Sequence, residues 1–476
     1  MREISRRLRS HHEAQHAIAD LLSIPDHPGP GHPSSGQRPP GHHPRGPVAG
    51  GGQRPGRAPL VAHLPGESGG DSYGAYFHVP FCDRLCSFCN LNREKIGGDP
   101  VRVFSRAREY AGVICSQLEE CQGHPFFGEG RVEALYFGGG TPTVLSPEDF
   151  SAVLSSAEEL FRYSSQCEIT VETTLHNLDG EMLDTLVRGG VNRLSLGVQT
   201  FSDQGRKVLA RSGDGERAFR RVAEIRKNFP GTLSIDLIYS YPGQTLEHLE
   251  DDARRAIDLG VDSVSFYSLM LQKDSPLEKS VRAGAISFDR TLETEEKLHR
   301  RFLSLLYGGG YELRELTKVV LPGRDAYRYI DLMYGAGSVL PFGTGAGGRV
   351  PGKCLMRPQP GMVMVAPRSE AEEAANRLLG TLQRGIYRPE ELVPEILIMA
   401  RTGGLSLEKS QLGGIIRKHI ERYRSEGLMD AVAPGEARLT ERGVFWGNNI
   451  AVDLLRALLS PEASFNPTQK KRKEKP

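Results

Sequence analysis

The chain is organised around Tyr76-Phe-His-Val-Pro-Phe-Cys-Asp-Arg-Leu-Cys-Ser-Phe-Cys89. This stretch places thiols at Cys82, Cys86 and Cys89, a C-x3-C-x2-C spacing that directly follows a short β-like run. Thiolates on one tight loop can converge on one metal centre, because soft sulfur ligands select iron–sulfur clusters, zinc or copper(I). Three ligands are one short of the four that close a structural zinc site or saturate a four-iron cluster. An open position on such a centre would accept a small molecule, although a zinc site or buried core thiols would show the same three residues.

Composition narrows the class of protein. The chain has 476 residues and a formal net charge of +1, so no general attraction to polyanions is expected. It has no run of eighteen apolar residues, and its basic N-terminus is not followed by the apolar core of a secretory signal, so we expect no membrane insertion. Seven cysteines, three of them in one loop, favour reduced thiols in a cytoplasmic setting over a disulfide framework.

Short apolar runs alternate with longer helical stretches from residue 74 onward. This alternation indicates βα units and a parallel sheet. The six predicted strands cover residues 76–80, 134–137, 168–172, 193–199, 233–239 and 263–269. Six such units predict an α/β fold with a partial (β/α)6 barrel, related to the full eight-stranded TIM barrel, in which chemistry collects at the carboxyl ends of the strands.

Polar motif residues fall at those strand ends. Gly138-Gly-Gly-Thr-Pro142 follows the second predicted strand, and Glu172, Gln199 and Asp236 lie in or at the ends of later ones. Glycines permit a close backbone approach, although a glycine run alone more often marks a tight turn. A carboxylate such as Glu172 can accept hydrogen bonds from a ribose diol, or it can be an ordinary polar strand end.

The chain divides into five predicted regions. Residues 1–72, rich in Gly, Pro, His and Arg, cannot bury enough apolar surface to stay ordered. Residues 73–280 form the barrel core, and 281–370 extend it, with 351–368 as a loop over or beside the site. Residues 371–462 read as a mainly helical, winged-helix-like domain that packs on the barrel rather than binding nucleic acid, because no basic recognition stripe appears. Residues 463–476 are a charged tail.

The cysteine spacing, with Phe88 before the last thiol, resembles the cluster loop of the radical S-adenosylmethionine (SAM) superfamily. The entry pattern Tyr76-x-His78-x-Pro80-Phe resembles its oxygen-independent coproporphyrinogen III oxidase-like group. The resemblance implies a [4Fe-4S] cluster held by the three cysteines, SAM bound at the remaining iron, and an electron from the cluster that cleaves SAM to a 5′-deoxyadenosyl radical.

The same resemblance implies positions for one or two SAM molecules. The glycine run resembles the motif that binds the SAM amino group, and the whole set of implied cofactor contacts is Tyr76, Phe88, Gly139, Gly140, Thr141, Pro142, Glu172, Gln199, Arg211 and Asp236. Of these, Tyr76, Gly140 and Glu172 match the first SAM, and Thr141, Gln199, Arg211 and Asp236 match the second. A planar Arg211 fork suits a SAM carboxylate. Arg211 and Asp236 would alternatively form a structural ion pair.

The implied substrate is a tetrapyrrole, haem or coproporphyrinogen III, with flavodoxin or ferredoxin as electron donor. The decarboxylating oxidase carries a further cysteine where this chain has Leu91, whereas the segment from Gly323 to Gly348 resembles the anaerobic haem-degrading methyltransferases of the anaerobilin-synthase type. A haem chaperone and a two-SAM C-methyltransferase of another pathway are the remaining alternatives. Aromatic residues would line a macrocycle pocket or belong to the ordinary core: Phe266, Tyr267, Tyr327, Tyr329 and Tyr334.

Overall fold

The computed structural model describes residues 58–66, 72–89, 94–96, 100–335, 337–402 and 407–459. Most of the segment predicted to be poorly ordered, the charged tail and Leu91 lie outside the described residues. Within that N-terminal segment, a short 3₁₀ turn, η1 (Leu60–His63), packs on the main core because Leu60 is fully buried. The Nζ of Lys353 donates a hydrogen bond to the carbonyl of His63, which ties this turn to the far edge of the sheet.

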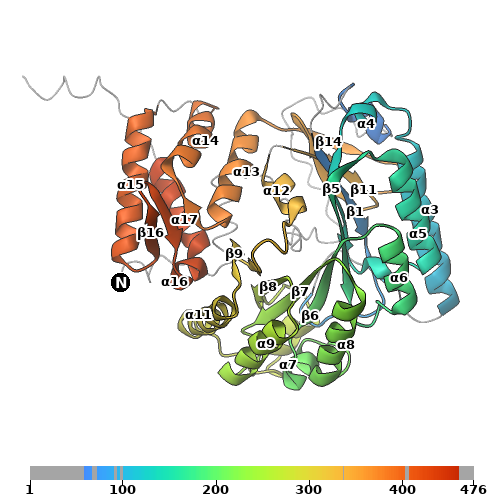
Figure 1. Cartoon of the computed structure of the whole chain (residues 1–476), viewed down its shortest axis with the longest axis horizontal. Helices are drawn as coiled ribbons and strands as arrows, with labels where there is room; N and C mark the ends of the chain where they lie inside the picture. Colours follow the sequence, from blue (N-terminus) through green and yellow to red (C-terminus); the bar gives the residue numbers. More distant parts are fainter. Residues whose placement is uncertain are drawn as a thin grey trace, which may run out of the picture.

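Six parallel strands in chain order form the centre of one large sheet, and they confirm the predicted partial barrel. Neighbours in the sheet are neighbours among the βα units, as expected when each helix returns the chain to the next strand. The sheet curls without closing (Figure 1). The six strands are β1 (Tyr73–Val79), β4 (Val132–Gly139), β5 (Tyr163–Thr174), β6 (Arg193–Gln199), β7 (Thr232–Tyr239) and β8 (Ser263–Ser268).

Helices cover the outer face of these strands (Figure 1). Several begin at a side chain that accepts a hydrogen bond from the first turn, such as Ser146 before α5 and Asp179 before α6. The helices are α3 (Pro100–Glu119), α4 (Pro125–Glu129), α5 (Pro147–Leu160), α6 (Gly180–Arg188), α7 (Asp203–Val208), α8 (Gly215–Asn228), α9 (Leu246–Asp258), α10 (Pro276–Arg282) and α11 (Leu292–Gly308).

Both edges of the parallel sheet are extended by later parts of the chain. Beyond β8 lie β10 (Lys318–Val320) and β9 (Glu312–Glu315), both antiparallel. Beyond β1, the parallel β11 (Ser338–Phe342) leads to three antiparallel strands. These are β12 (Gly347–Val350), β13 (Lys353–Met356) and β14 (Met364–Pro367).

The prediction that residues 351–368 form a loop over or beside the site is wrong. Two of the edge strands, β13 and β14, pair there in a regular antiparallel register from Lys353 opposite Pro367 to Met356 opposite Met364. The sequence of β14, Met-Val-Ala-Pro, does not alternate between apolar and polar residues, which is the pattern that identifies a half-buried strand. All four of its residues are exposed in the structure. Pairing with the sheet edge supplies the order that composition does not reveal.

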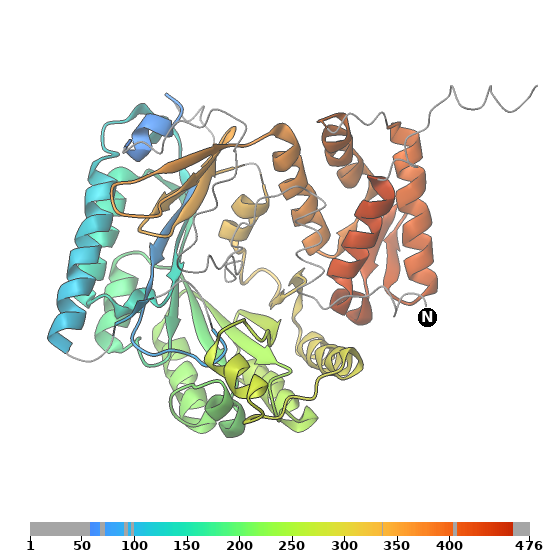
Figure 2. The same cartoon turned by 180° about the vertical axis from the view of Figure 1, so that it is seen from behind.

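The C-terminal region forms a separate packing unit beside the barrel, visible from both sides (Figures 1 and 2). Its small antiparallel sheet confirms the predicted β-wing. The unit is attached through α11, where Glu296 accepts hydrogen bonds from Arg442 and from the indole of Trp446. It consists of α13 (Glu370–Gln383), α14 (Pro389–Thr402), α15 (Lys409–Ser425), α16 (Glu441–Phe445), α17 (Gly447–Leu458), β15 (Ile386–Tyr387), β16 (Met429–Ala433) and β17 (Glu436–Leu439).

Candidate active site

The cysteine loop lies at the carboxyl end of β1, where the barrel architecture collects chemistry. Cys82 ends the short strand β2 (Phe81–Cys82), which pairs with β3 (Glu94–Lys95). Ser87 anchors the middle of the loop, because its amide donates to the carbonyl of Leu209 at 3.3 Å and its hydroxyl to that of Val208 at 2.6 Å. These bonds fix the loop against the end of α7, on the opposite side of the barrel mouth.

Phe88 gives the loop an apolar anchor. Its ring is half-buried and packs on a small cluster of buried residues that includes Leu209, Ile238, Tyr241 and Leu277. The amide of Leu277, in α10, also donates to the carbonyl of Ser87 at 2.8 Å. The residue before the last cysteine is therefore a packing residue that holds the thiols in place.

Two polar side chains from distant segments reach the thiols. The Nη1 atom of Arg211 lies 3.0 Å from Cys86 Sγ, and the hydroxyl of Thr141 lies 3.7 Å from Cys82 Sγ. Arg211 is held by a further hydrogen bond from Nη2 to the carbonyl of Gly197. A charged guanidinium suits an anionic sulfur, because hydrogen bonds to ionised groups are the strong ones.

The residues of this loop fit an iron–sulfur cluster by their donor chemistry. All seven cysteines of the chain lie among the described residues, and no disulfide joins any two of them. Across the described ranges, no three His, Cys, Asp or Glu side chains form a group suited to one metal ion. A four-iron cluster instead takes one thiolate at each of several irons, so its ligands do not need to converge on a single atom.

The glycine run allows the β4 end to approach the cysteine loop closely. The amide of Gly140 donates to the carbonyl of Val79 at 2.7 Å, and the amide of Thr141 donates to that of Phe81 at 2.7 Å. A Cβ on Gly140 would lie 2.3 Å from the Phe81 oxygen. Gly139 has a φ of 113°, a conformation that favours glycine. The run is thus both a tight turn and a close contact, and Pro142 then begins the 3₁₀ turn η2 (Pro142–Val144).

Glu172 is a buried carboxyl at the end of β5. It accepts hydrogen bonds from the Tyr136 hydroxyl at 2.6 Å and from the Gly139 amide at 3.2 Å. Burial raises its pKa to about 7, and the negative charge of Asp236 acts in the same direction. Nearby, the Tyr76 hydroxyl lies 3.0 Å from the Nδ1 of His78. Glu172 therefore connects the glycine run to the barrel interior, and the pKa of its carboxyl lies close to neutral pH.

Two buried polar atoms at the carboxyl end of β6 have no hydrogen-bond partner among the described residues. They are Oε1 of Gln199 and Nε of Arg211. Gln199 also has a φ of 67°, in the left-handed region that costs energy for a residue with a side chain. Unsatisfied buried groups are expensive, so these two atoms mark a place suited to a polar ligand.

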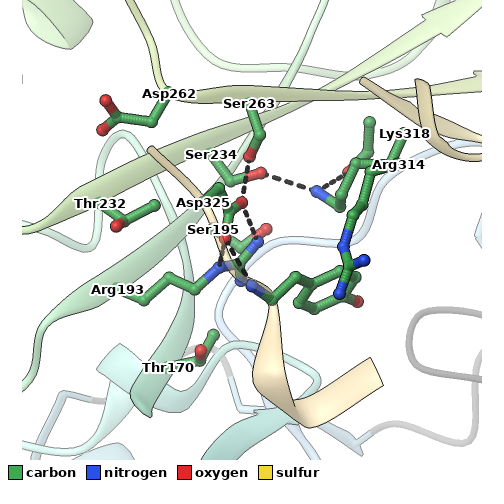
Figure 3. A network of polar contacts seen from close by, with 12 residues as sticks. Thr170, Arg193, Ser195, Thr232, Ser234, Asp262, Ser263, Arg314, Lys318 and Asp325 are labelled. Atoms are coloured by element: carbon green, nitrogen blue, oxygen red, sulfur yellow. Dashed lines mark hydrogen bonds and ion pairs between the residues drawn. The ribbon is translucent and has the colours of Figure 1, made fainter. Parts of the chain in front are cut away.

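A buried polar network lies deeper in the barrel, below this mouth (Figure 3). Arg193 forms a bidentate ion pair with Asp325, with both N–O distances 2.9 Å. The Nζ of Lys318 donates to the hydroxyls of Ser234 at 2.9 Å and Ser265 at 2.6 Å. Burial lowers the Lys318 pKa. The sequence motifs did not single out these residues, although a charged residue inside an apolar strand-like run was the available signal.

Asp236 belongs to this network and does not pair with Arg211. Its Oδ1 lies 3.5 Å from the hydroxyl of Ser195, and burial raises its pKa while the charge of Lys318 opposes that effect. Arg211 instead contacts Cys86 and Gly197. The alternative in which Arg211 and Asp236 form a structural ion pair is therefore wrong, because strand β7 directs Asp236 inward and the α7–α8 connection carries Arg211 to the rim.

The predicted aromatic set is split between two faces of the sheet. Tyr327 and Tyr329 flank the start of α12 (Arg328–Tyr334) and pack inside the barrel, where the Tyr329 ring stacks on Tyr136 at 4.4 Å. Phe266 instead packs outward, 5.8 Å from the Phe302 ring in α11. Alternate residues of a strand point to opposite faces, so Phe266 cannot share a pocket with the tyrosines. Tyr327 and Tyr329 are buried in packed core, and Tyr334 packs against them partly buried.

Comparison with known proteins decides the family. A family model described as the radical SAM superfamily matches residues 76–256, from the start of the cysteine stretch into α9. Residues 76–256 of the chain therefore form a radical SAM domain. Members of this superfamily use a [4Fe-4S] cluster and SAM, and the chain is accordingly a radical SAM enzyme.

Similar proteins share much of this radical SAM chain. Anaerobilin synthase from Escherichia coli O157:H7 is 26% identical over 386 residues, which cover 80% of the chain and 83% of that protein. Heme chaperone HemW from Lactococcus lactis is 31% identical over 255 residues, covering 53% of the chain and 63% of that protein. The solved structure of Escherichia coli coproporphyrinogen III oxidase (HemN), itself described as a radical SAM enzyme, superposes with a TM-score of 0.64 at 20% identity. That match covers 83% of the chain and 91% of HemN, and it shows a shared fold.

The radical SAM barrel therefore brings most predicted site residues to one rim. Phe88, the glycine run, Gln199 and Arg211 meet around the cysteine loop, whereas Asp236 lies lower, in the buried network. In the described part of the chain, no helix is long and apolar enough to cross a membrane.

Proposed function

We propose that this radical SAM enzyme acts on a tetrapyrrole and that its substrate is haem, which it methylates and opens. The observation that carries this proposal is the extent of similarity to anaerobilin synthase, which covers 80% of the chain and so reaches beyond the barrel. The similarity to the haem chaperone HemW covers 53%. Likeness over most of the chain favours a shared substrate class more than likeness of the barrel alone.

The three cysteines would hold the cluster in this proposal. When bound, a [4Fe-4S] cluster supplies the electron that cleaves SAM to a 5′-deoxyadenosyl radical. Cys82, Cys86 and Cys89 stand on one loop whose backbone is fixed through Ser87. The Arg211 guanidinium offsets the negative charge of the sulfurs. Both this guanidinium and the Thr141 hydroxyl orient the sulfurs by donating toward them. This arrangement supports the assignment because it places fixed positive charge where anionic ligands are needed.

One SAM molecule would be bound through Tyr76, Gly140 and Glu172. The close approach of the glycine run to the cysteine loop leaves backbone rather than side chain facing the thiols. Glu172, held by Tyr136 and the Gly139 amide, offers a carboxyl that can accept hydrogen bonds from a ribose diol. Burial raises the pKa of this carboxyl to about 7, and a bound diol or cation would favour its ionised form.

A second SAM molecule would be bound by Thr141, Gln199, Arg211 and Asp236. The support is the pair of unpartnered buried atoms, Gln199 Oε1 and Arg211 Nε, beside the cysteine loop. A SAM carboxylate would satisfy the arginine, and a hydroxyl or ammonium group would satisfy the amide oxygen. Asp236 contributes from below, since its carboxyl faces Ser195 and the Lys318 charge. A second SAM is also the source of carbon that a methylating enzyme requires.

Haem chaperone activity is the second candidate, because HemW from Lactococcus lactis is 31% identical over its matched part. Oxidative decarboxylation of coproporphyrinogen III is disfavoured by Leu91, which stands where the decarboxylating oxidase has a further cysteine and which lies outside the described residues. In each case a flavodoxin or ferredoxin would supply electrons, and we expect the reducing cytoplasm that such carriers occupy.

One anaerobic experiment separates these functions. The full chain is reconstituted with iron and sulfide and mixed with SAM, dithionite and haem. We expect 5′-deoxyadenosine together with a methylated, ring-opened tetrapyrrole, identified by mass spectrometry. Haem that stays bound and intact would identify a chaperone, and release of carbon dioxide from coproporphyrinogen III would identify the oxidase; either result would overturn the proposal.

The cysteine assignment has its own control. A Cys86→Ala chain should retain little iron and sulfide and form no 5′-deoxyadenosine, because it lacks one ligand. Cys115 is a half-buried thiol of α3, away from the loop. A Cys115→Ala chain should therefore bind the cluster normally. Equal iron contents in the two variants would contradict the assignment.

A further inference from the structure

A cationic cleft of about 750 Å³ opens beside the cysteine loop. It lies between the connection from β5 to α6, the connection from α7 to α8, and the first turns of α8. Two carboxylates, Asp179 and Glu224, face six arginines there, although the whole chain carries a net charge of only +1. The arginines are Arg84, Arg206, Arg211, Arg217, Arg220 and Arg221.

Two of the arginines and both carboxylates already have hydrogen-bond or ion-pair partners within the protein. Arg206 is buried and donates to the carbonyls of Val198, Thr200, Ser212 and Gly213. Arg221 pairs with Glu224 at 2.5 Å. Asp179 accepts a hydrogen bond from the first turn of α6 as its N-cap. The two lining carboxylates therefore have partners within the fold. Asp214, the N-cap of α8, is a further acid, whose pKa is lowered by the hydrogen bond from the Arg217 amide and by the charges of Arg220 and Arg217.

The rim presents three exposed cations. Arg84, Arg217 and Arg220 are all exposed to solvent. Among the described residues, neither Arg84 nor Arg217 has a carboxylate within ion-pair distance, and Arg220 has only Glu216, at 3.8 Å. Arg84 donates to the hydroxyl of Ser212 at 2.7 Å, which holds it across the cleft. Next to it, Leu85 is 39% exposed and adds an apolar contact.

This rim lies beside the loop that carries the thiols. Arg84 and Leu85 stand between Cys82 and Cys86 in the sequence of the loop. Arg211 lines the cleft and places its Nη1 atom 3.0 Å from Cys86 Sγ. A molecule that contacts Arg84 and Leu85 therefore touches the loop that carries the predicted cluster ligands. Short separations matter because electron transfer slows steeply with distance.

We propose that this rim, made by Arg84, Leu85, Arg217 and Arg220, is the docking surface for an acidic one-electron carrier protein. The inference rests on the proposed function, which requires an electron from outside the chain. Its cations are spread along an exposed edge beside an apolar residue rather than converging on one point, which suits a protein surface better than a small anion. Carrier complexes are small and transient, and charge complementarity sets their encounter rate.

The test reverses charge on the rim away from the predicted cofactor contacts. The Arg217→Glu, Arg220→Glu double variant changes two exposed residues of α8. The matched control is Arg417→Glu, Lys418→Glu, which makes the same change on exposed residues of α15, in the C-terminal unit. The probe is a purified flavodoxin. Binding of its oxidised form is measured by fluorescence anisotropy, and reduced flavodoxin or dithionite drives 5′-deoxyadenosine formation.

We expect the rim variant to bind oxidised flavodoxin about tenfold more weakly than the wild type or the control at low ionic strength. The difference should shrink in salt, because exposed charges are screened. The KM for reduced flavodoxin should rise in parallel, while the dithionite-driven rate stays unchanged. Equal flavodoxin binding by the rim variant and the control would overturn the docking surface. Inhibition of the dithionite-driven reaction by inorganic phosphate, lost only in the rim variant, would also overturn it by assigning the cleft to a small anion. Failure of dithionite to yield 5′-deoxyadenosine would instead refute the proposed function.

Discussion

Substitution of Gly140 by alanine tests the contact on which the site depends. A Cβ there would lie 2.3 Å from the Phe81 carbonyl oxygen and 2.8 Å from its carbon, about 1 Å short of ordinary contact. The atoms that would clash with this Cβ belong to the backbone of Phe81, so no side chain can rotate away to make room. Overpacking costs about 1–3 kcal/mol. The two backbone hydrogen bonds that join this turn to Val79 and Phe81 would weaken at about 1 kcal/mol each.

We therefore expect Gly140→Ala to lower the free energy of unfolding by roughly 3–5 kcal/mol, measured by urea denaturation of the cofactor-free chain. Phe81 directly precedes Cys82, so the displaced turn should also move the first thiol. A shift of about 1 Å in a positioned group can cost about 100-fold in rate. Iron content and 5′-deoxyadenosine formation after reconstitution should fall accordingly.

Gly112 provides the matched control. It lies exposed in α3, and a Cβ built there meets nothing within 4 Å. Gly112→Ala should stabilise the chain by up to about 1 kcal/mol, because alanine favours helix, and should leave iron content unchanged. A Gly140→Ala chain with the unfolding free energy and iron content of the wild type would refute the argument that close backbone approach builds this site.

Three further perturbations test other parts of the structure. Asp325→Ala should destabilise the chain by about 3–5 kcal/mol in urea denaturation by leaving Arg193 buried and unpaired, and a second substitution, Arg193→Met, should recover part of that loss; no recovery would contradict it. Burial raises the pKa of Asp252 to about 7, above its ordinary 3.8, so the folded state retains a proton that the unfolded state releases. Stability should fall by about 3 kcal/mol as pH rises from 4 to 7, and the Asp252→Asn chain should lack this part of the slope; an unchanged slope would exclude the carboxyl as its source. Chelation of iron from the reconstituted chain should abolish visible absorption and SAM cleavage together, and retained cleavage would show that the cluster is not required.

Local patterns in the sequence determined much of this protein. The alternation of apolar runs with helical stretches predicted the six parallel strands, and the predicted bounds of the fourth strand, 193–199, are those of β6. The C-x3-C-x2-C spacing placed the cysteine loop after the first strand and indicated its family. These features follow from hydrogen bonds and side-chain periodicity within a few residues, which a single chain displays directly.

Contacts between distant segments were decided only by the tertiary structure. Arg211 contacts Cys86, which lies 125 residues earlier in the chain. Strand β11, which comes after all six barrel strands in the sequence, pairs with the first of them, β1. The edge strands that replaced the predicted loop owe their order to a neighbour rather than to their own composition. The direction of Asp236, into a network with Lys318, depends on which face of β7 became the interior. Sequence shows which groups a strand or loop carries, but pairing across the barrel decides which of them share a site, because the favourable energy of each contact exists only once the sheet has formed.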